Sequence, residues 1–188
     1  MQNLQKLNLG CGTDIRAGYI NVDKHGNPPF KYDLETFPWP WKTNSISEIL
    51  LIHTLEHLGE TRDIYFNIIK EIYRVCINGA SVIIHVPHPR HDDFFIDPTH
   101  VRPITPEGIN MFSKKFNQEC VTKGYPTTPL GIYLDVDIEV VQVSVKPVKY
   151  WARKLYAKEI TEDDFFHAAK QHNNVIETIM MQAYIHKF

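Results

Sequence analysis

The sequence predicts one α/β domain built on a doubly wound, mostly parallel sheet, arranged as a three-layer sandwich that ends in an antiparallel pair of C-terminal strands. Short apolar runs alternate with helical or loop stretches through the first half of the chain, which is typical of a parallel sheet. The run over 49–52 is unbroken and apolar, as expected for a strand buried on both faces. The length of 188 residues fits a single domain spanning 1–188.

The first half contains five expected strands and one long expected helix. The strands are expected over 6–9, 19–22, 30–32, 49–52 and 81–86. The helix is expected over 60–76, because Ile64, Ile68, Ile72 and Val75 recur at helical spacing and form one apolar face. Asn78 and Gly79 follow as its predicted stop signal. The two prolines within 37–41 exclude a central strand from that aromatic segment.

The second half has a different pattern. A long polar loop is expected over 87–103, followed by a short helix with Thr105 as N-cap and Pro106 at its first position. The stretch 117–131 reads as irregular. The β-branched, alternating segment 137–145 predicts a strand that pairs with 175–184, and a helix is expected over 162–172 between them.

Composition limits the functional classes. Hydrophobic residues make up 43% and charged residues 22% of the chain, and the net charge is −2. A nucleic-acid partner is therefore not favoured, because proteins that bind phosphate backbones usually carry a basic excess. No apolar run approaches the roughly 18 residues of a membrane span, and no signal peptide is recognised at Met1–Leu9. The three cysteines fit neither a disulfide framework nor a zinc module, so a reducing, cytoplasmic setting is expected.

Three consecutive strand ends carry groups that a nucleoside needs. Gly10 and Gly12 follow the first strand, where bare backbone lets a ligand approach closely. Ile15 stands where a dinucleotide fingerprint needs its third glycine, so this turn is not built for a pyrophosphate. Asp23 ends the second strand and can accept ribose hydroxyls. The Asp33-Leu34 pair follows the third strand, where it can bind adenine; each feature alone is equally consistent with an ordinary turn.

Together these segments resemble the cofactor motifs of class I S-adenosylmethionine-dependent methyltransferases, in the small-molecule branch with a His-x-Leu-Glu-His segment. The resemblance spans about Lys6 to Val86 and implies a Rossmann-like fold. It is carried by Leu7–Gly12, Asn21–Asp23, Asp33-Leu34, Ile52–Leu58, Glu71–Val75 and Gly79-Ala80. It implies S-adenosylmethionine as cofactor and S-adenosylhomocysteine as product. The implied cofactor-binding residues are Asn8, Gly10, Cys11, Gly12, Asp23, Asp33, Leu34 and His53.

Two features depart from the family pattern. Only six residues separate Gly12 from Tyr19, so the usual helix after the first strand has no room. Asn8 stands where an acidic residue is common, and an amide cannot pair ionically with the cofactor's amino group. In the Ile52–Leu58 segment, Glu56 and His57 are expected to fix the turn after the fourth strand. The departures place cofactor affinity in question more than fold.

The acceptor is expected near the loop over 87–102, because six of the ten histidines lie between His53 and His100. His88 or His100 is a candidate general base. The candidate acceptor-binding residues are Arg90, Asp97 and Arg102. A solvated loop remains an alternative, and no metal is expected.

The sequence thus predicts a methyltransferase for a small-molecule or saccharide-like acceptor. The alternatives are a non-catalytic cofactor-binding or interaction protein and, less favoured, a metal-dependent hydrolase that uses the His- and Asp-rich loop 85–100. The sequence does not indicate the oligomeric state.

Overall fold

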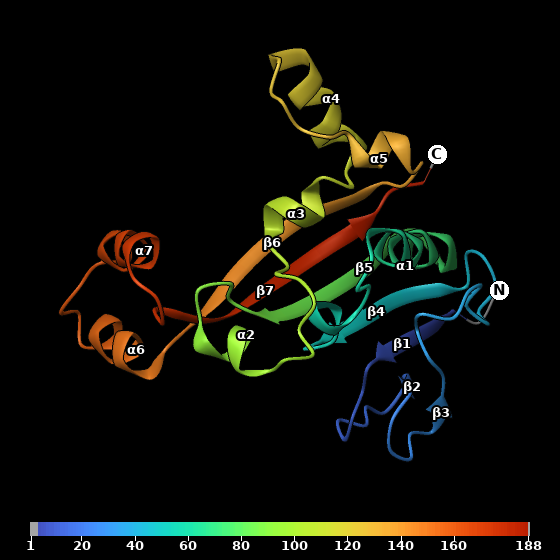
Figure 1. The fold of residues 1–188 in the computed structure, drawn as a ribbon, viewed down its shortest axis with the longest axis horizontal. Helices are drawn as coiled ribbons and strands as arrows, with labels where there is room; N and C mark the ends of the chain where they lie inside the picture. Colours follow the sequence, from blue (N-terminus) through green and yellow to red (C-terminus); the bar gives the residue numbers. More distant parts are fainter. Residues whose placement is uncertain (1–3, 188) are drawn as a thin grey trace.

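The computed structural model describes residues 4–187 and contains one seven-stranded sheet with the order β3-β2-β1-β4-β5-β7-β6 (Figure 1). The chain adds strands outward from β1 in one direction and then returns to add β4 and β5 in the other. The strands are β1 (Gln5–Leu9), β2 (Ile20–Asp23), β3 (Phe30–Lys31), β4 (Ile46–Ile52), β5 (Cys76–Pro87), β6 (Ile138–Pro147) and β7 (Ile176–Ile185).

The strand directions confirm the predicted doubly wound, mostly parallel sheet. Strands β1 to β5 pair in parallel, whereas β7 pairs antiparallel with both β5 and β6. The order reverses between β1 and β4, whose carboxyl ends therefore open onto one crevice. In open α/β sheets, ligands bind at such a point.

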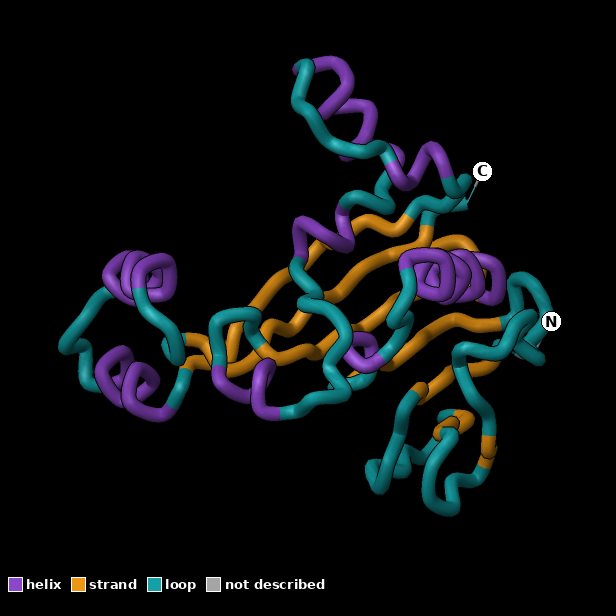
Figure 2. The backbone as a smooth tube through the Cα atoms, in the orientation of Figure 1, coloured by secondary structure: helices purple, strands orange, loops and turns teal. Residues whose placement is uncertain are grey.

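In the described chain, the helices come after β4, β5 and β6, and none lies between β1 and β4 (Figure 2). The helical segments are η1 (Leu55–His57), α1 (Arg62–Val75), α2 (Asp92–Ile96), α3 (Pro106–Asn110), α4 (Lys114–Lys123), α5 (Leu130–Tyr133), α6 (Lys149–Tyr156) and α7 (Glu162–Gln171). In Figure 1, α6 and α7 lie beyond one end of the antiparallel β6–β7 pair, and α4 and α5 lie near its other end.

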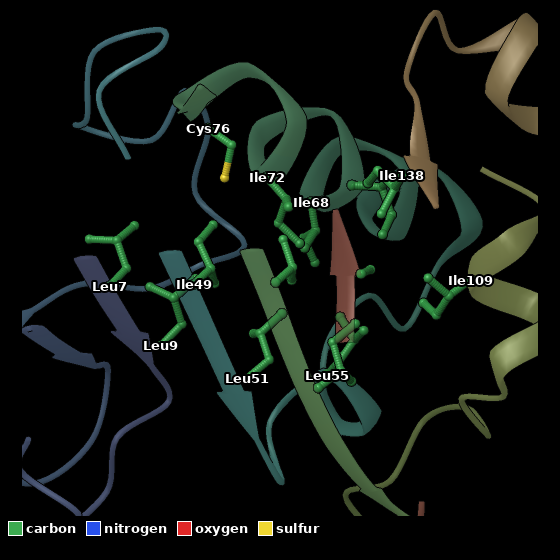
Figure 3. Close-up of a cluster of buried hydrophobic side chains, with 14 of the residues drawn as sticks. Leu7, Leu9, Ile49, Leu51, Leu55, Ile68, Ile72, Cys76, Ile109 and Ile138 are labelled. Carbon is green, nitrogen blue, oxygen red and sulfur yellow. The ribbon is translucent and has the colours of Figure 1, made fainter. Parts of the chain in front are cut away.

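The main core lies between α1 and one face of the sheet. Figure 3 shows Leu7 and Leu9 of β1 and Ile49 of β4 on the face of the sheet toward which Ile68 and Ile72 of α1 point, and all five are at most 2% exposed. The predicted apolar face of the helix is therefore confirmed. Its burial anchors the strands whose carboxyl ends form the crevice.

The opposite face of the sheet is less deeply buried. Within residues 4–187, no helix joins β1 to β2, as the short spacing after Gly12 predicted, and none joins β2 to β3 or β3 to β4. Along β5, Val82 and Ile84 are buried on the helical side, while Ser81 and Ile83 on the other side are half-buried. The third layer of the expected sandwich is accordingly thin.

Two local predictions were wrong. Helix α1 ends at Val75, and Cys76 already begins β5, so Gly79 lies inside a strand with φ +77° and is not the helix stop. The segment expected to be irregular contains α4, which Ser113 caps by accepting a hydrogen bond from the Phe116 amide, and Gly124 ends it in the left-handed region. The sequence of α4 has little apolar periodicity, so pattern alone missed it.

The other predicted elements are confirmed with small shifts in their ends. Thr105 caps α3 with Pro106 in its first turn, and Thr161 opens α7 with a capping box. Helix α6 and the short α2 were not predicted. Among residues 4–187, no helix is long and apolar enough to cross a membrane.

Candidate functional site

One pocket of about 460 Å³ opens at the carboxyl ends of the first four strands. Five residues that the sequence singled out for the cofactor line it together: Gly10, Asp23, Asp33, Leu34 and His53. They come from four separate segments, and the order reversal between β1 and β4 brings them together. Seven further lining residues are Lys24, His25, Tyr32, Thr54, His57, Leu58 and Thr99.

Gly10 allows the chain to turn tightly at the pocket wall. Its φ is +67°, and a Cβ built there would lie 2.3 Å from Thr54 Cγ2. Thr54 is itself buried and donates its hydroxyl to the Leu9 carbonyl at 3.0 Å. Only glycine fits between β1 and the start of η1 without a shift of this contact.

The carboxylate of Asp23 is held by backbone amides. Its Oδ2 accepts from the Gly12 amide at 2.9 Å, and its Oδ1 accepts from the His25 amide at 2.8 Å. Each oxygen keeps a lone pair for a ligand hydroxyl. Gly12, which does not line the pocket, therefore acts by orienting Asp23.

Asn8 and Cys11 lie behind the pocket wall. Asn8 is 2% exposed, and its amide nitrogen donates to the Asp14 carbonyl at 2.7 Å and to Asn21 Oδ1 at 2.9 Å. Its donors are thus used to hold the loop that replaces the expected helix. Burial raises the pKa of the Cys11 thiol, and neither residue lines the pocket.

His53 has a strained backbone at the end of β4. Its φ is +51°, which is unusual for a residue with a side chain, and its amide donates to the His85 carbonyl at 2.8 Å. The neighbouring Glu56 carboxylate, whose Oε1 lies 3.5 Å from His53 Nδ1, raises the pKa of the imidazole. His53 therefore lines the pocket with an imidazole that lies beside a buried carboxylate.

The two candidate bases of the loop after β5 have different surroundings. His88 Nδ1 accepts from the Arg90 amide at 3.1 Å, so a neutral ring carries its proton on Nε2, and desolvation lowers its pKa. It does not line the pocket. His100 stacks on Phe94, and its ring centroid lies 4.5 Å from that of His57, a lining residue.

The three candidate acceptor-binding residues are separated. Arg90 donates to the Lys170 carbonyl on α7, away from the pocket lining. Asp97 accepts from the Thr99 hydroxyl at 2.6 Å and so supports a lining residue. The Arg102 guanidinium donates to the Gly59 carbonyl and lies 4.1 Å from the centre of the Tyr65 ring. Of these residues, Asp97 has the most direct connection with the pocket.

His57 and Thr99 are lining residues whose role the sequence reasoning missed. His57 Nδ1 lies 2.8 Å from Thr99 Oγ1, and the Val101 amide donates to the Glu56 carbonyl at 2.9 Å. These bonds fix the loop after α2 against η1. The only available signal was the histidine in the Leu-Glu-His segment, which we expected to serve the turn.

Solved structures with this fold were found, although no family model and no curated relative matches the chain. An S-adenosylmethionine-dependent methyltransferase from Archaeoglobus fulgidus matches with a TM-score of 0.61 at 16% identity, over 97% of this chain and 87% of that one. The chain has the class I S-adenosylmethionine-dependent methyltransferase fold. This confirms the predicted fold, while the methyltransferase activity, the cofactor, the branch and the acceptor stay predictions.

Other structures share this methyltransferase fold. One from Thermotoga maritima, also named an S-adenosylmethionine-dependent methyltransferase, has a TM-score of 0.52 at 14% identity, over 100% of this chain and 84% of that one. The [4+2]-cyclase SpnF has a TM-score of 0.53 at 13% identity, over 98% and 76%. The fold thus supports more than one reaction, and the site must supply the functional argument.

Proposed function

We propose that this chain is an S-adenosylmethionine-dependent methyltransferase that transfers a methyl group to a small-molecule or saccharide-like acceptor. The observation that carries the proposal is that five predicted cofactor residues line one shared pocket. This pocket lies at the point where the strand order reverses. Its volume of about 460 Å³ lies in the ordinary range for small-molecule sites.

Each lining group has a role that fits the cofactor. Asp23, oriented by two amides, would accept the ribose hydroxyls. Asp33 would accept from the adenine amino group, with Leu34 and Tyr32 against the ring. Gly10 would offer its backbone at the pocket wall to the amino-acid portion. The sulfonium of the bound cofactor supplies an activated methyl group, so this chain mainly has to align the acceptor.

Binding of the cofactor product tests the proposal. Calorimetry with S-adenosylhomocysteine should show 1:1 binding that Asp23→Ala weakens by at least about tenfold, since a charge-assisted hydrogen bond contributes about 1.5–3 kcal/mol. Asp63→Ala is the matched control, because Asp63 is 78% exposed on α1 and outside the pocket. No binding by the wild-type chain at millimolar ligand would refute the proposal.

A non-catalytic cofactor-binding protein is the second candidate, and the geometry of Asn8 favours it. The Asn8 amide is directed to Asp14 and Asn21 and not into the pocket, so the common acidic contact with the cofactor is missing. Binding of S-adenosylhomocysteine without turnover on a panel of hydroxylated acceptors would favour this candidate. No observation favours the hydrolase, since among the described residues the loop contributes only His100 to a potential metal cluster.

A further inference from the structure

Glu56 is a buried carboxylate without a hydrogen-bond partner. The residue is 1% exposed, and neither Oε1 nor Oε2 accepts a hydrogen bond from any described residue. The imidazole of His53 lies beside it, with Nδ1 3.5 Å from Oε1, which is too long for a normal hydrogen bond. A buried carboxylate is costly unless a cation or several donors compensate it, so this group indicates a missing partner.

Two imidazoles lie beside this carboxylate. One ligand atom from each of Glu56, His57 and His100 lies within 4.8 Å of the others. Glu56 and His57 belong to η1, whereas His100 comes from the loop after α2, which backbone and side-chain bonds fasten to η1. Zinc–ligand bonds are about 2.0–2.1 Å long, so these side chains would have to move inward to hold one ion.

Hydrogen bonds set the tautomer of both rings. The Thr99 hydroxyl gives its single proton to Asp97 at 2.6 Å, so it must accept from Nδ1–H of His57 at 2.8 Å. His100 Nδ1 lies 2.8 Å from the Phe94 carbonyl, which can only accept. Each neutral ring therefore keeps its lone pair on Nε2. Histidines that bind metals are oriented in this way, with the second nitrogen bonded to a carbonyl or to a chain ending in a carboxylate.

From these observations we infer that Glu56, His57 and His100 form a binding site for a divalent transition-metal ion such as Zn²⁺. Two imidazoles and one carboxylate are a common ligand set for such ions, and the remaining positions are open to exogenous ligands. The site differs from the loop cluster considered from the sequence, where no metal was expected. Two of its ligands come from a segment that pattern alone assigned to the turn.

The position of the site gives it a role that rests on the proposed function. His57 and Thr99 line the proposed cofactor pocket, so an acceptor hydroxyl bound to the ion would face the methyl group. The ion would lower the pKa of that hydroxyl, whose proton leaves to water. The oxygen then bonds to the methyl carbon, and the carbon–sulfur bond breaks with its electron pair going to sulfur. The site thus points to a hydroxyl-bearing acceptor.

Titration of the chelator-treated chain of 188 residues with Zn²⁺ tests the site. Calorimetry should show one tight ion per chain, and Glu56→Gln and His100→Ala should each weaken it by more than about 100-fold. Thr99→Val should weaken it by about 10–100-fold, the usual effect of removing a histidine's second partner. His172→Ala, an exposed histidine after α7, is the matched control and should bind as the wild type does. No zinc binding by the wild type, or equal binding by Glu56→Gln, would overturn the inference.

Melting of the metal-free chain provides a second measurement. If Glu56 lacks a partner, Glu56→Gln should keep or raise the melting temperature and lose the rise that Zn²⁺ causes in the wild type. A lower melting temperature for the metal-free variant would show that Glu56 is already paired, which contradicts the inference. S-adenosylhomocysteine binding by the same samples separates the two proposals, because the metal site can fail while the cofactor still binds.

Discussion

Replacement of Gly10 by alanine is the sharpest test of how the pocket wall is built. The new methyl carbon would lie 2.3 Å from Thr54 Cγ2, 2.4 Å from Oγ1 and 2.9 Å from Cβ. Thr54 cannot easily move away, because it is 6% exposed and its hydroxyl is bonded to the Leu9 carbonyl. Gly10→Ala should therefore destabilise both the turn and its packing.

Two separate costs add at this position. A left-handed backbone costs a residue with a side chain about 1–2 kcal/mol, and overpacking a filled site costs about 1–3 kcal/mol. Their sum predicts a loss of about 2–5 kcal/mol in the free energy of unfolding. Gly12→Ala is the matched control, because Gly12 has φ +49° but nothing within 4 Å of a Cβ. It should show the first cost alone.

Urea unfolding followed by far-UV circular dichroism measures both variants, with equal m-values as the test of two-state behaviour. In a Thr54→Ala background, Gly10→Ala should cost less, because the two shortest contacts are gone and only the contact with Cβ remains. The reasoning is refuted if Gly10→Ala and Gly12→Ala differ by less than about 0.5 kcal/mol.

Three further variants test other parts of the molecule. Glu71→Gln breaks a pair in which Arg74 donates to both carboxylate oxygens at 2.7 Å. Thermal unfolding should show a loss of about 2–3 kcal/mol in the free energy of unfolding. This loss is below the value for fully buried pairs because Arg74 is 30% exposed. The partners of Glu71 outweigh its burial and lower its pKa, so the wild type should lose this stabilisation as pH falls below the ordinary glutamate pKa of about 4.3, while the variant should not. Asn8→Asp should destabilise the chain by about 1–3 kcal/mol in urea, since a carboxylate would face Asn21 Oδ1, and it should not tighten S-adenosylhomocysteine binding in calorimetry. Ile68→Ala, at a fully buried position of α1, should lower the free energy of unfolding in urea by about 2–5 kcal/mol.

The part of the pocket that we propose for the cofactor was predictable because its signals are local. Gly10, Asp23 and Asp33 each follow a strand that a short apolar run already identifies. In a parallel sheet, the carboxyl ends of neighbouring strands meet at one edge, so order along the chain was enough to bring these residues together. Asn8 and Cys11 belong to the same motif but face away from the pocket, which sequence spacing does not reveal.

The loop that we expected to bind the acceptor was not predictable in the same way. His88 and Arg90 stand in a loop rich in chemically active residues, yet their bonds hold that loop to itself and to α7. His100, by contrast, meets His57 across more than forty positions of the chain. Loop conformation depends on individual hydrogen bonds, and a residue list contains no periodic signal for them.

The sequence by itself determined the mostly parallel sheet with its antiparallel C-terminal pair, the helix α1 and the residues at the strand ends, because alternation, apolar runs and helical spacing follow directly from backbone geometry. The tertiary structure alone decided that Glu56, His57 and His100 form a cluster. The physical reason is that this cluster depends on the contacts between η1 and the loop after α2. Contacts between distant segments exist only once the whole sheet has brought those segments together.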